Sequence, residues 1–93
     1  MKVTIEELRT LSLSLFEALE SEIGNEEIEV EWPLYWDVPN IQRYNAYAEP
    51  TDLTLGNLEE DWEAVNRMAD GTDAPVRYGL VWLASVFRYV GGK

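Results

Sequence analysis

The chain has 93 residues, with 18 acidic and 7 basic side chains, a formal net charge of −11, and neither Cys nor His. The missing thiols and imidazoles exclude disulfides, thiol nucleophiles, an imidazole base and the usual ligands of zinc, copper and iron. The negative charge repels nucleic acid and anionic lipid, so we expect neither as a partner. The length predicts a single domain, residues 1–93, which we expect to be a monomer.

The amino-terminal residues predict a helix. Thr4 and Glu7 match a capping box, in which the hydroxyl and the carboxylate each accept a hydrogen bond from the other residue's amide. Apolar residues then recur on one broad face over residues 5–23, and Gly24 supplies the stop. The amino terminus lacks the apolar core of a signal peptide, so we expect a cytoplasmic protein.

The middle of the chain predicts a small antiparallel sheet. Residues 26–32 alternate between apolar and acidic side chains, which is typical of a half-exposed strand. Pro33 and Pro39 bracket a segment that we expect to be an irregular turn. Residues 42–48 alternate again and are expected to return antiparallel to the first strand. Residues 53–55 would add a short third strand.

Two more helices are expected at the carboxyl end. Asn57 caps a helix that continues to about Ala69, and Gly71 ends it. Residues 74–90 are apolar around most of a helical circumference, which predicts a helix buried by its own protein. The sequence therefore predicts an α+β fold, in which three helices pack with a two- or three-stranded antiparallel sheet and the last helix is buried.

Acidic residues gather on two of these regular elements and in two loops. On regular elements they are Glu27, Glu29 and Glu31 of the first strand, and Glu59, Glu63 and Asp70 of the helix after Asn57. We interpret both sets as solvated faces, because alternate strand residues lie about 7 Å apart and like charges on a helix cost only a few tenths of a kcal/mol.

The acid-bearing loops are candidates for a calcium site. Their candidate ligands are Asp37, Asn40, Asp70, Thr72 and Asp73. Calcium takes about six to eight oxygen ligands, and irregular loops supply them well because their carbonyl groups are free. The alternative is that Asp37 and Asn40 form Asx turns and that Asp73 only caps the last helix. Neither loop has the EF-hand spacing.

Three strings, YWDVPN, RYNAYAEPTDLTLGNLEEDWE and YGLVWLASVFRYVGGK, give the chain a resemblance to a known family. It resembles the CcbP family of small acidic cyanobacterial calcium-binding proteins, from about Tyr35 to the end. The resemblance implies a compact α+β protein that binds Ca²⁺ without EF-hands and buffers or signals calcium. It also implies Asp37 and Asp73 as ligands, with Asp70 as an alternative to Asp73.

The leading hypothesis is therefore a calcium buffer or sensor. The alternative is an acidic protein-interaction module that presents Glu59, Glu63 and the acidic strand face to a basic partner protein. We do not expect an enzyme, because no nucleophile stands beside a base and a domain this small leaves little room for a substrate cleft.

Overall fold

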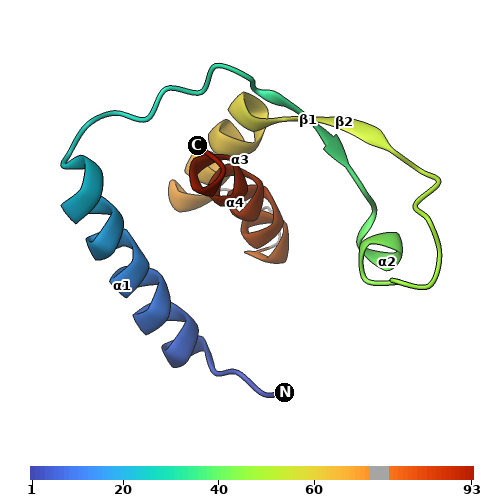
Figure 1. The fold of residues 1–93 in the computed structure, drawn as a ribbon, viewed down its shortest axis with the longest axis horizontal. Coiled ribbons are helices and arrows are strands. Elements are labelled where there is room, and N and C mark those ends of the chain that lie inside the picture. Colours follow the sequence, from blue (N-terminus) through green and yellow to red (C-terminus); the bar gives the residue numbers. More distant parts are fainter. Residues whose placement is uncertain (72–75) are drawn as a thin grey trace.

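A computed structural model describes residues 1–71 and 76–93. In these residues the order of elements is α1 (Ile5–Ile23), β1 (Leu34–Asp37), α2 (Asn40–Arg43), β2 (Thr54–Asn57), α3 (Leu58–Ala69) and α4 (Val76–Gly91) (Figure 1). The two strands form an antiparallel sheet. The α+β class is confirmed, and the single turn of α2 is a helix that the sequence analysis did not predict.

Helix α1 begins where the sequence predicts. The Thr4 hydroxyl accepts a hydrogen bond from the Glu7 amide at 3.0 Å, and the Glu7 carboxylate accepts one from the Thr4 amide at 3.2 Å. The helix ends at Gly24, whose φ of 68° favours glycine. The rest of the chain lies to one side of α1, and the two are joined by an extended segment (Figure 1).

The predicted strand at residues 26–32 and its predicted partner at 42–48 are both wrong. The first segment is without regular structure, and the second contains the end of α2 and turns. The sheet instead pairs Leu34–Asp37, which was expected to be an irregular turn, with Thr54–Asn57. The weaker third-strand prediction at 53–55 overlaps this second strand. Alternation alone therefore did not identify the strands or the segments that pair.

The Gln42 side chain explains why the predicted return strand is lost. Its carbonyl oxygen accepts hydrogen bonds from the Thr51 and Asp52 amides at 2.7 and 3.2 Å, and its amide donates to the Asp52 carboxylate at 2.5 Å. These bonds tie α2 to the segment that leads into β2. Because residue 42 is held in this way, residues 42–48 form the connection of a long hairpin.

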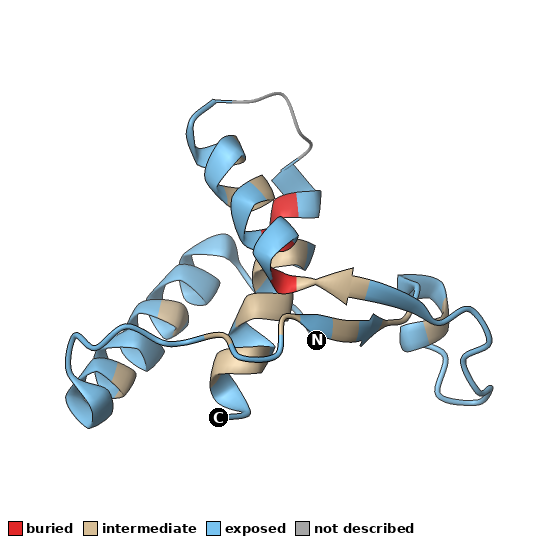
Figure 2. Ribbon diagram, turned by 90° about the horizontal axis from the view of Figure 1, so that it is seen from above, coloured by how far each residue is buried: buried red, intermediate tan, exposed pale blue. Residues whose placement is uncertain are grey.

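Helices α3 and α4 pack against each other and provide most of the buried surface. The Asn57 side chain caps α3 by accepting from the Glu59 amide at 2.9 Å, as predicted. Leu58, with 4 % of its surface exposed, is the buried apolar residue of the described chain (Figure 2). Gly79 lets α4 approach the Met68 side chain, whose sulfur would lie 2.8 Å from an added Cβ.

The expectation that the last helix is buried is wrong. Gly79 is the buried residue of α4, and Leu80 keeps 63 % of its surface exposed. The half-buried side chains of α4 lie mostly on the sides toward α3 and β1, and Phe87 contacts Phe16 of α1. Val76 and Leu80 stay largely exposed. The apolar circumference of α4 therefore exceeds what its own chain covers. Within the described residues, no helix combines the length and apolar character needed to cross a membrane.

A tyrosine holds the sheet against α3. The Tyr35 hydroxyl donates to the Asp61 carboxylate at 2.5 Å, and Asp61 is 9 % exposed. Tyr35 pairs with Gly56 across the sheet, and its ring lies where a side chain at Gly56 would project. The Leu58 amide also donates to the Pro33 carbonyl at 2.7 Å. Together these contacts fix the start of α3 to β1.

Candidate interaction site

Most of the apolar face of α1 is uncovered. The side chains that make this face and remain largely exposed are Ile5, Leu8, Leu11, Leu15 and Phe16. Leu15, near the middle of the helix, keeps 69 % of its surface exposed. Phe16 contacts Phe87 of α4 edge to face, with 5.4 Å between the ring centroids. Exposed apolar surface of this extent marks an interaction site in a soluble protein.

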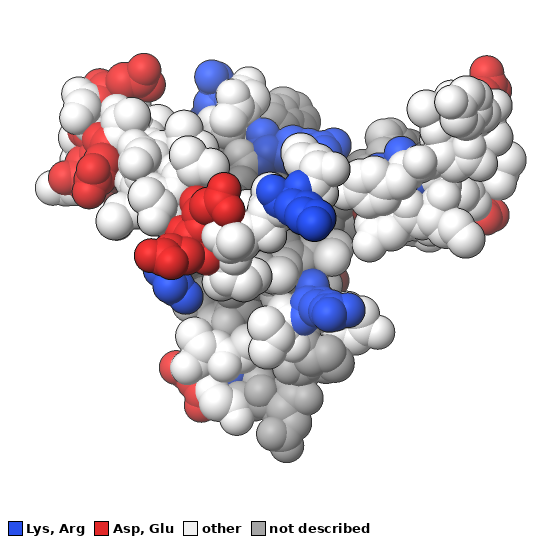
Figure 3. Space-filling model, turned by 90° about the horizontal axis from the view of Figure 1, so that it is seen from below, with Lys and Arg blue, Asp and Glu red and all other residues white. Residues whose placement is uncertain are grey.

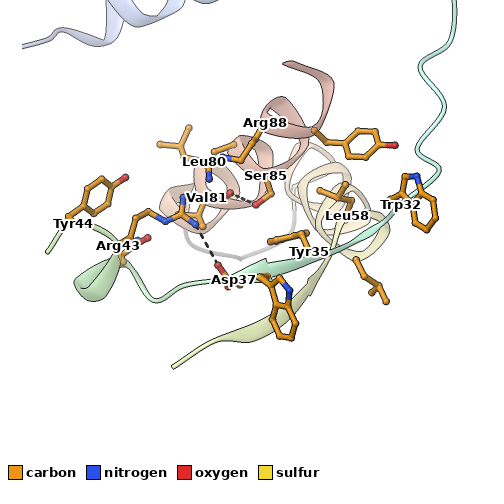
Figure 4. Close-up of a pocket in the computed structure, with 15 residues that line it drawn as sticks. Trp32, Tyr35, Asp37, Arg43, Tyr44, Leu58, Leu80, Val81, Ser85 and Arg88 are labelled. Carbon is orange, nitrogen blue, oxygen red and sulfur yellow. Dashed lines mark hydrogen bonds and ion pairs between the residues drawn. The ribbon is translucent and has the colours of Figure 1, made fainter. Parts of the chain in front are cut away.

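A groove lies on a different part of the molecule, between β1 and α4. Its volume is about 520 Å³. The side chains that argue for binding there are Trp36, Tyr44, Leu80, Val81 and Arg88. Figure 4 shows Leu80, Val81 and Arg88 on α4, with Tyr44 and Arg43 across the groove near α2. The groove therefore has aromatic and aliphatic walls and is open to solvent on one side.

Two arginines make this groove locally basic in an acidic protein. Arg43 and Arg88 both line it. Arg43 Nη2 lies 3.9 Å from Asp37 Oδ1, with both side chains partly exposed, so the pair is a weak one. Lys and Arg side chains gather near the middle of one face, with Asp and Glu mostly around them (Figure 3). The groove therefore suits an apolar ligand that carries carboxylates at its margins.

Tyr35 closes the inner end of the groove. Its pKa is raised above 10.0, first because burial disfavours the phenolate and second because Asp61 accepts a hydrogen bond from the phenol. The neutral phenol is therefore the form that the fold stabilises. Because its hydroxyl is already engaged with Asp61, Tyr35 supplies an aromatic wall and not a proton donor for a ligand.

The structure brings two of the predicted metal ligands to one place. Asp37 at the end of β1 and Asn40 at the start of α2 both line the groove. Asp70 caps the carboxyl end of α3, where its backbone amide donates to the Asn66 carbonyl at 3.1 Å. Thr72 and Asp73 lie outside the described residues. Within residues 1–71 and 76–93, no three acidic side chains converge in a way that could hold a metal ion.

Sequence reasoning missed the groove and its arginines. It left Arg88 inside a helix that was predicted to be buried and Arg43 inside a predicted strand. The available signal was the small number of basic residues. The chain has 7 of them, so two arginines near one apolar helix would have indicated a locally basic surface. Recognising that pair required the hairpin that brings α2 beside α4, and the predicted sheet did not contain it.

No protein-family model matches the chain, and neither a curated protein nor a solved structure is similar to it.

Proposed function

We propose that this chain is a protein-interaction module whose binding element is the apolar face of α1. The observation that carries the proposal is the exposure of that face, from Ile5 through Leu15. Burying the rest of a leucine of this kind contributes roughly 1 to 2 kcal/mol. Micromolar binding corresponds to about 8 kcal/mol, so a partner has to cover most of this face. The unfavourable free energy of exposing these leucines to water is removed when a partner covers them.

The charge of α1 indicates the kind of partner. The acidic residues of this helix are Glu6, Glu7, Glu17, Glu20 and Glu22, against Arg9 as its basic residue. An acidic helix inside a chain of net charge −11 attracts a surface that combines apolar side chains with lysine or arginine. The partner class is therefore a basic protein, as in the second sequence hypothesis. The surface that we propose for this partner is α1. The sequence hypothesis had assigned partner binding to Glu59, Glu63 and residues 26–32.

We expect the double variant Leu11→Gln with Leu15→Gln to bind a basic partner on the order of tenfold to a hundredfold more weakly than the wild-type chain. Glutamine keeps the helix propensity and the approximate length of leucine but removes the apolar contact. The probe is a fluorescently labelled amphipathic helical peptide made of leucine and lysine. Fluorescence anisotropy at low and at high salt measures its affinity.

The matched control is Thr10→Gln with Ser14→Gln, which places the same residues on the polar side of the same helix. It should bind the peptide as the wild-type chain does. A peptide in which glutamate replaces lysine should bind far more weakly, because it meets a like-charged helix. Equal binding by the two double variants, or no binding by the wild-type chain, would rule out α1 as the element that binds a basic partner protein.

Calcium binding is the second candidate. It is supported by the position of Asp37 and Asn40 on one groove and by the half-exposed carboxylate of Asp37. These two side chains provide fewer than the six to eight oxygens that calcium takes. The described residues alone therefore do not make a complete site, and the proposal depends on further oxygens, with Thr72 and Asp73 outside the described part.

If this candidate holds, Asp37→Ala will weaken the tighter calcium site at least about tenfold, because it removes the charged ligand. Calorimetric titration with Ca²⁺, with Mg²⁺ as the control ion, measures the affinity. Glu49→Ala removes one exposed carboxylate outside the groove and should leave the isotherm unchanged. Absence of heat at submillimolar calcium, or an equal response to magnesium, contradicts the candidate.

A further inference from the structure

We infer that the groove between β1 and α4 binds helix α1 of a second copy of this chain, so that two copies exchange their amino-terminal helices. The inference rests on the proposed function, since α1 is the binding element in both, and it names the partner as the chain itself. It departs from the monomer that the sequence predicts. Three observations carry it: the surface area, the complementary character of the two surfaces, and their positions.

The exposed surface is larger than one folded copy should have. The chain exposes 8336 Å² at a mass of 10.7 kDa, whereas a compact monomer of that mass exposes about 5,500 Å². Its radius of gyration is 15.0 Å, against about 12 Å for a compact domain of this length. The excess of about 2,800 Å² is more than the roughly 1,000 to 2,500 Å² that one partner of an obligate dimer buries, so a second copy could cover most of it.

The two surfaces are complementary. Helix α1 offers a row of leucines with glutamates beside it, and the groove offers Leu80, Val81 and aromatic walls between Arg43 and Arg88. Apolar contact supplies the affinity, and the opposite charges at the margins favour α1 over a basic helix. With 19 residues, α1 is about as long as the 16-residue α4 against which it would lie.

The positions of α1 and the groove favour a second copy over the same copy. In two perpendicular views α1 lies on one side of α4 and the hairpin of β1 and β2 on the other (Figures 1 and 2). The groove is on the hairpin side, where Arg43 and Trp36 line it. The chain's own α1 is held away from the groove by its contact between Phe16 and Phe87. A second copy's helix can approach the groove from the solvent side.

Exchange between two copies also closes the assembly. Each copy has one α1 and one groove, so a twofold axis makes two identical contacts and leaves neither surface free. We therefore expect a dimer and not an open chain of copies.

The first test is the molar mass in solution by sedimentation equilibrium across about 1 to 200 μM, a range that brackets micromolar association. The wild-type chain should be a dimer. The helix variant Leu11→Gln with Leu15→Gln and the groove variant Leu80→Gln with Ala84→Gln should each be monomers. Tyr47→Gln, which changes a fully exposed aromatic residue outside the groove, should remain a dimer. A wild-type monomer overturns the inference, and so does a dimer that either double variant leaves intact.

Mixing the two double variants tests which surfaces meet. The groove variant keeps a normal α1 and the helix variant keeps a normal groove, so a 1:1 mixture should form a heterodimer through one intact contact. Native mass spectrometry detects it. If the mixture stays monomeric while each variant keeps its wild-type circular dichroism, then α1 does not bind the groove.

Disulfide trapping keeps the inference testable if a double variant fails to fold. The chain has no cysteine, so Leu15→Cys in one copy and Ala84→Cys in another report on one pair of positions. Under mild oxidation we expect a mixed disulfide, several-fold more abundant than with Thr10→Cys in place of Leu15→Cys. Equal yields from the two pairs overturn the inference.

Failure of this inference and failure of the proposed function are distinguishable. The groove variant keeps α1 free, so it should bind the basic peptide even though it cannot dimerise. A chain that binds the peptide but stays monomeric loses only the second copy as partner. A chain that dimerises through α1 but does not bind the peptide loses only the heterologous basic partner.

Discussion

Gly56→Ala should lower the free energy of unfolding by about 3 kcal/mol, the sum of lost packing and a broken, partly buried hydrogen bond. An added Cβ at Gly56 would overlap the phenol ring of Tyr35, its partner across the sheet. The ring has to swing away, and its hydroxyl then leaves Asp61. The backbone of Gly56 lies outside the left-handed region, so alanine itself is compatible with the strand. Chemical denaturation monitored by tryptophan fluorescence measures the change.

Gly91→Ala is the matched control. Gly91 is at the end of α4, and an added Cβ there meets nothing within 4 Å. This substitution should be neutral or stabilise the fold by up to about 1 kcal/mol, because alanine is the better helix former. If Gly56→Ala behaves as Gly91→Ala does, the ring of Tyr35 does not lie across Gly56.

Tyr35→Phe should cost about 2 kcal/mol, within the range for hydrogen bonds to charged groups. The substitution keeps the ring and removes the hydroxyl that donates to Asp61, a side chain 9 % exposed. The carboxylate would remain buried without that donor. Adding Asp61→Leu to Tyr35→Phe should recover part of the loss, since no polar group is then left unpaired. A Tyr35→Phe chain as stable as the wild type would show that the bond contributes nothing.

The difference between wild type and Tyr35→Phe should also depend on pH. Burial and the bond to Asp61 raise the pKa of Tyr35 above 10.0 in the folded chain. The unfolded chain therefore loses this proton at lower pH than the folded chain does. The stabilisation is fully present below pH 10 and is lost as the pH rises through the folded pKa. The two chains should converge in stability at alkaline pH, which paired denaturation curves from pH 7 upward would reveal.

The helices were predictable because their signals are local. The free amides at a helix start are capped by residues only a few positions away. In the structure the Thr4 side chain accepts from the Glu7 amide, and the Asn57 side chain accepts from the Glu59 amide. The sheet was not predictable in the same way, because pairing depends on residues far apart. Four residues between Pro33 and Pro39 find their partner at Thr54–Asn57, about 20 positions away. No alternation in either segment specifies that choice.

The candidate site was predictable only in part. Asp37 and Asn40 were selected as neighbours in one loop, and they do line one groove. That groove also contains Arg88, which is about 50 positions further along the chain. The exposure of Leu80 could not be inferred either. An apolar stripe indicates that a surface is covered, but it does not tell whether the same chain or a partner covers it. The same pattern predicts a buried helix and a docking surface.

The segment between α1 and β1 has a consequence for local opening. It is held by a bond from the Glu31 amide to the Tyr89 hydroxyl at 3.0 Å and one from Lys93 to the Glu29 carbonyl at 2.5 Å. So few restraints let α1 detach while the sheet, α3 and α4 stay folded. Amide hydrogens of α1 should therefore exchange with deuterium much sooner than those of α3. In a dimer, the amide hydrogens of α1 should be as protected as those of α3. The exchange rate of α1 therefore reports whether the chain has assembled.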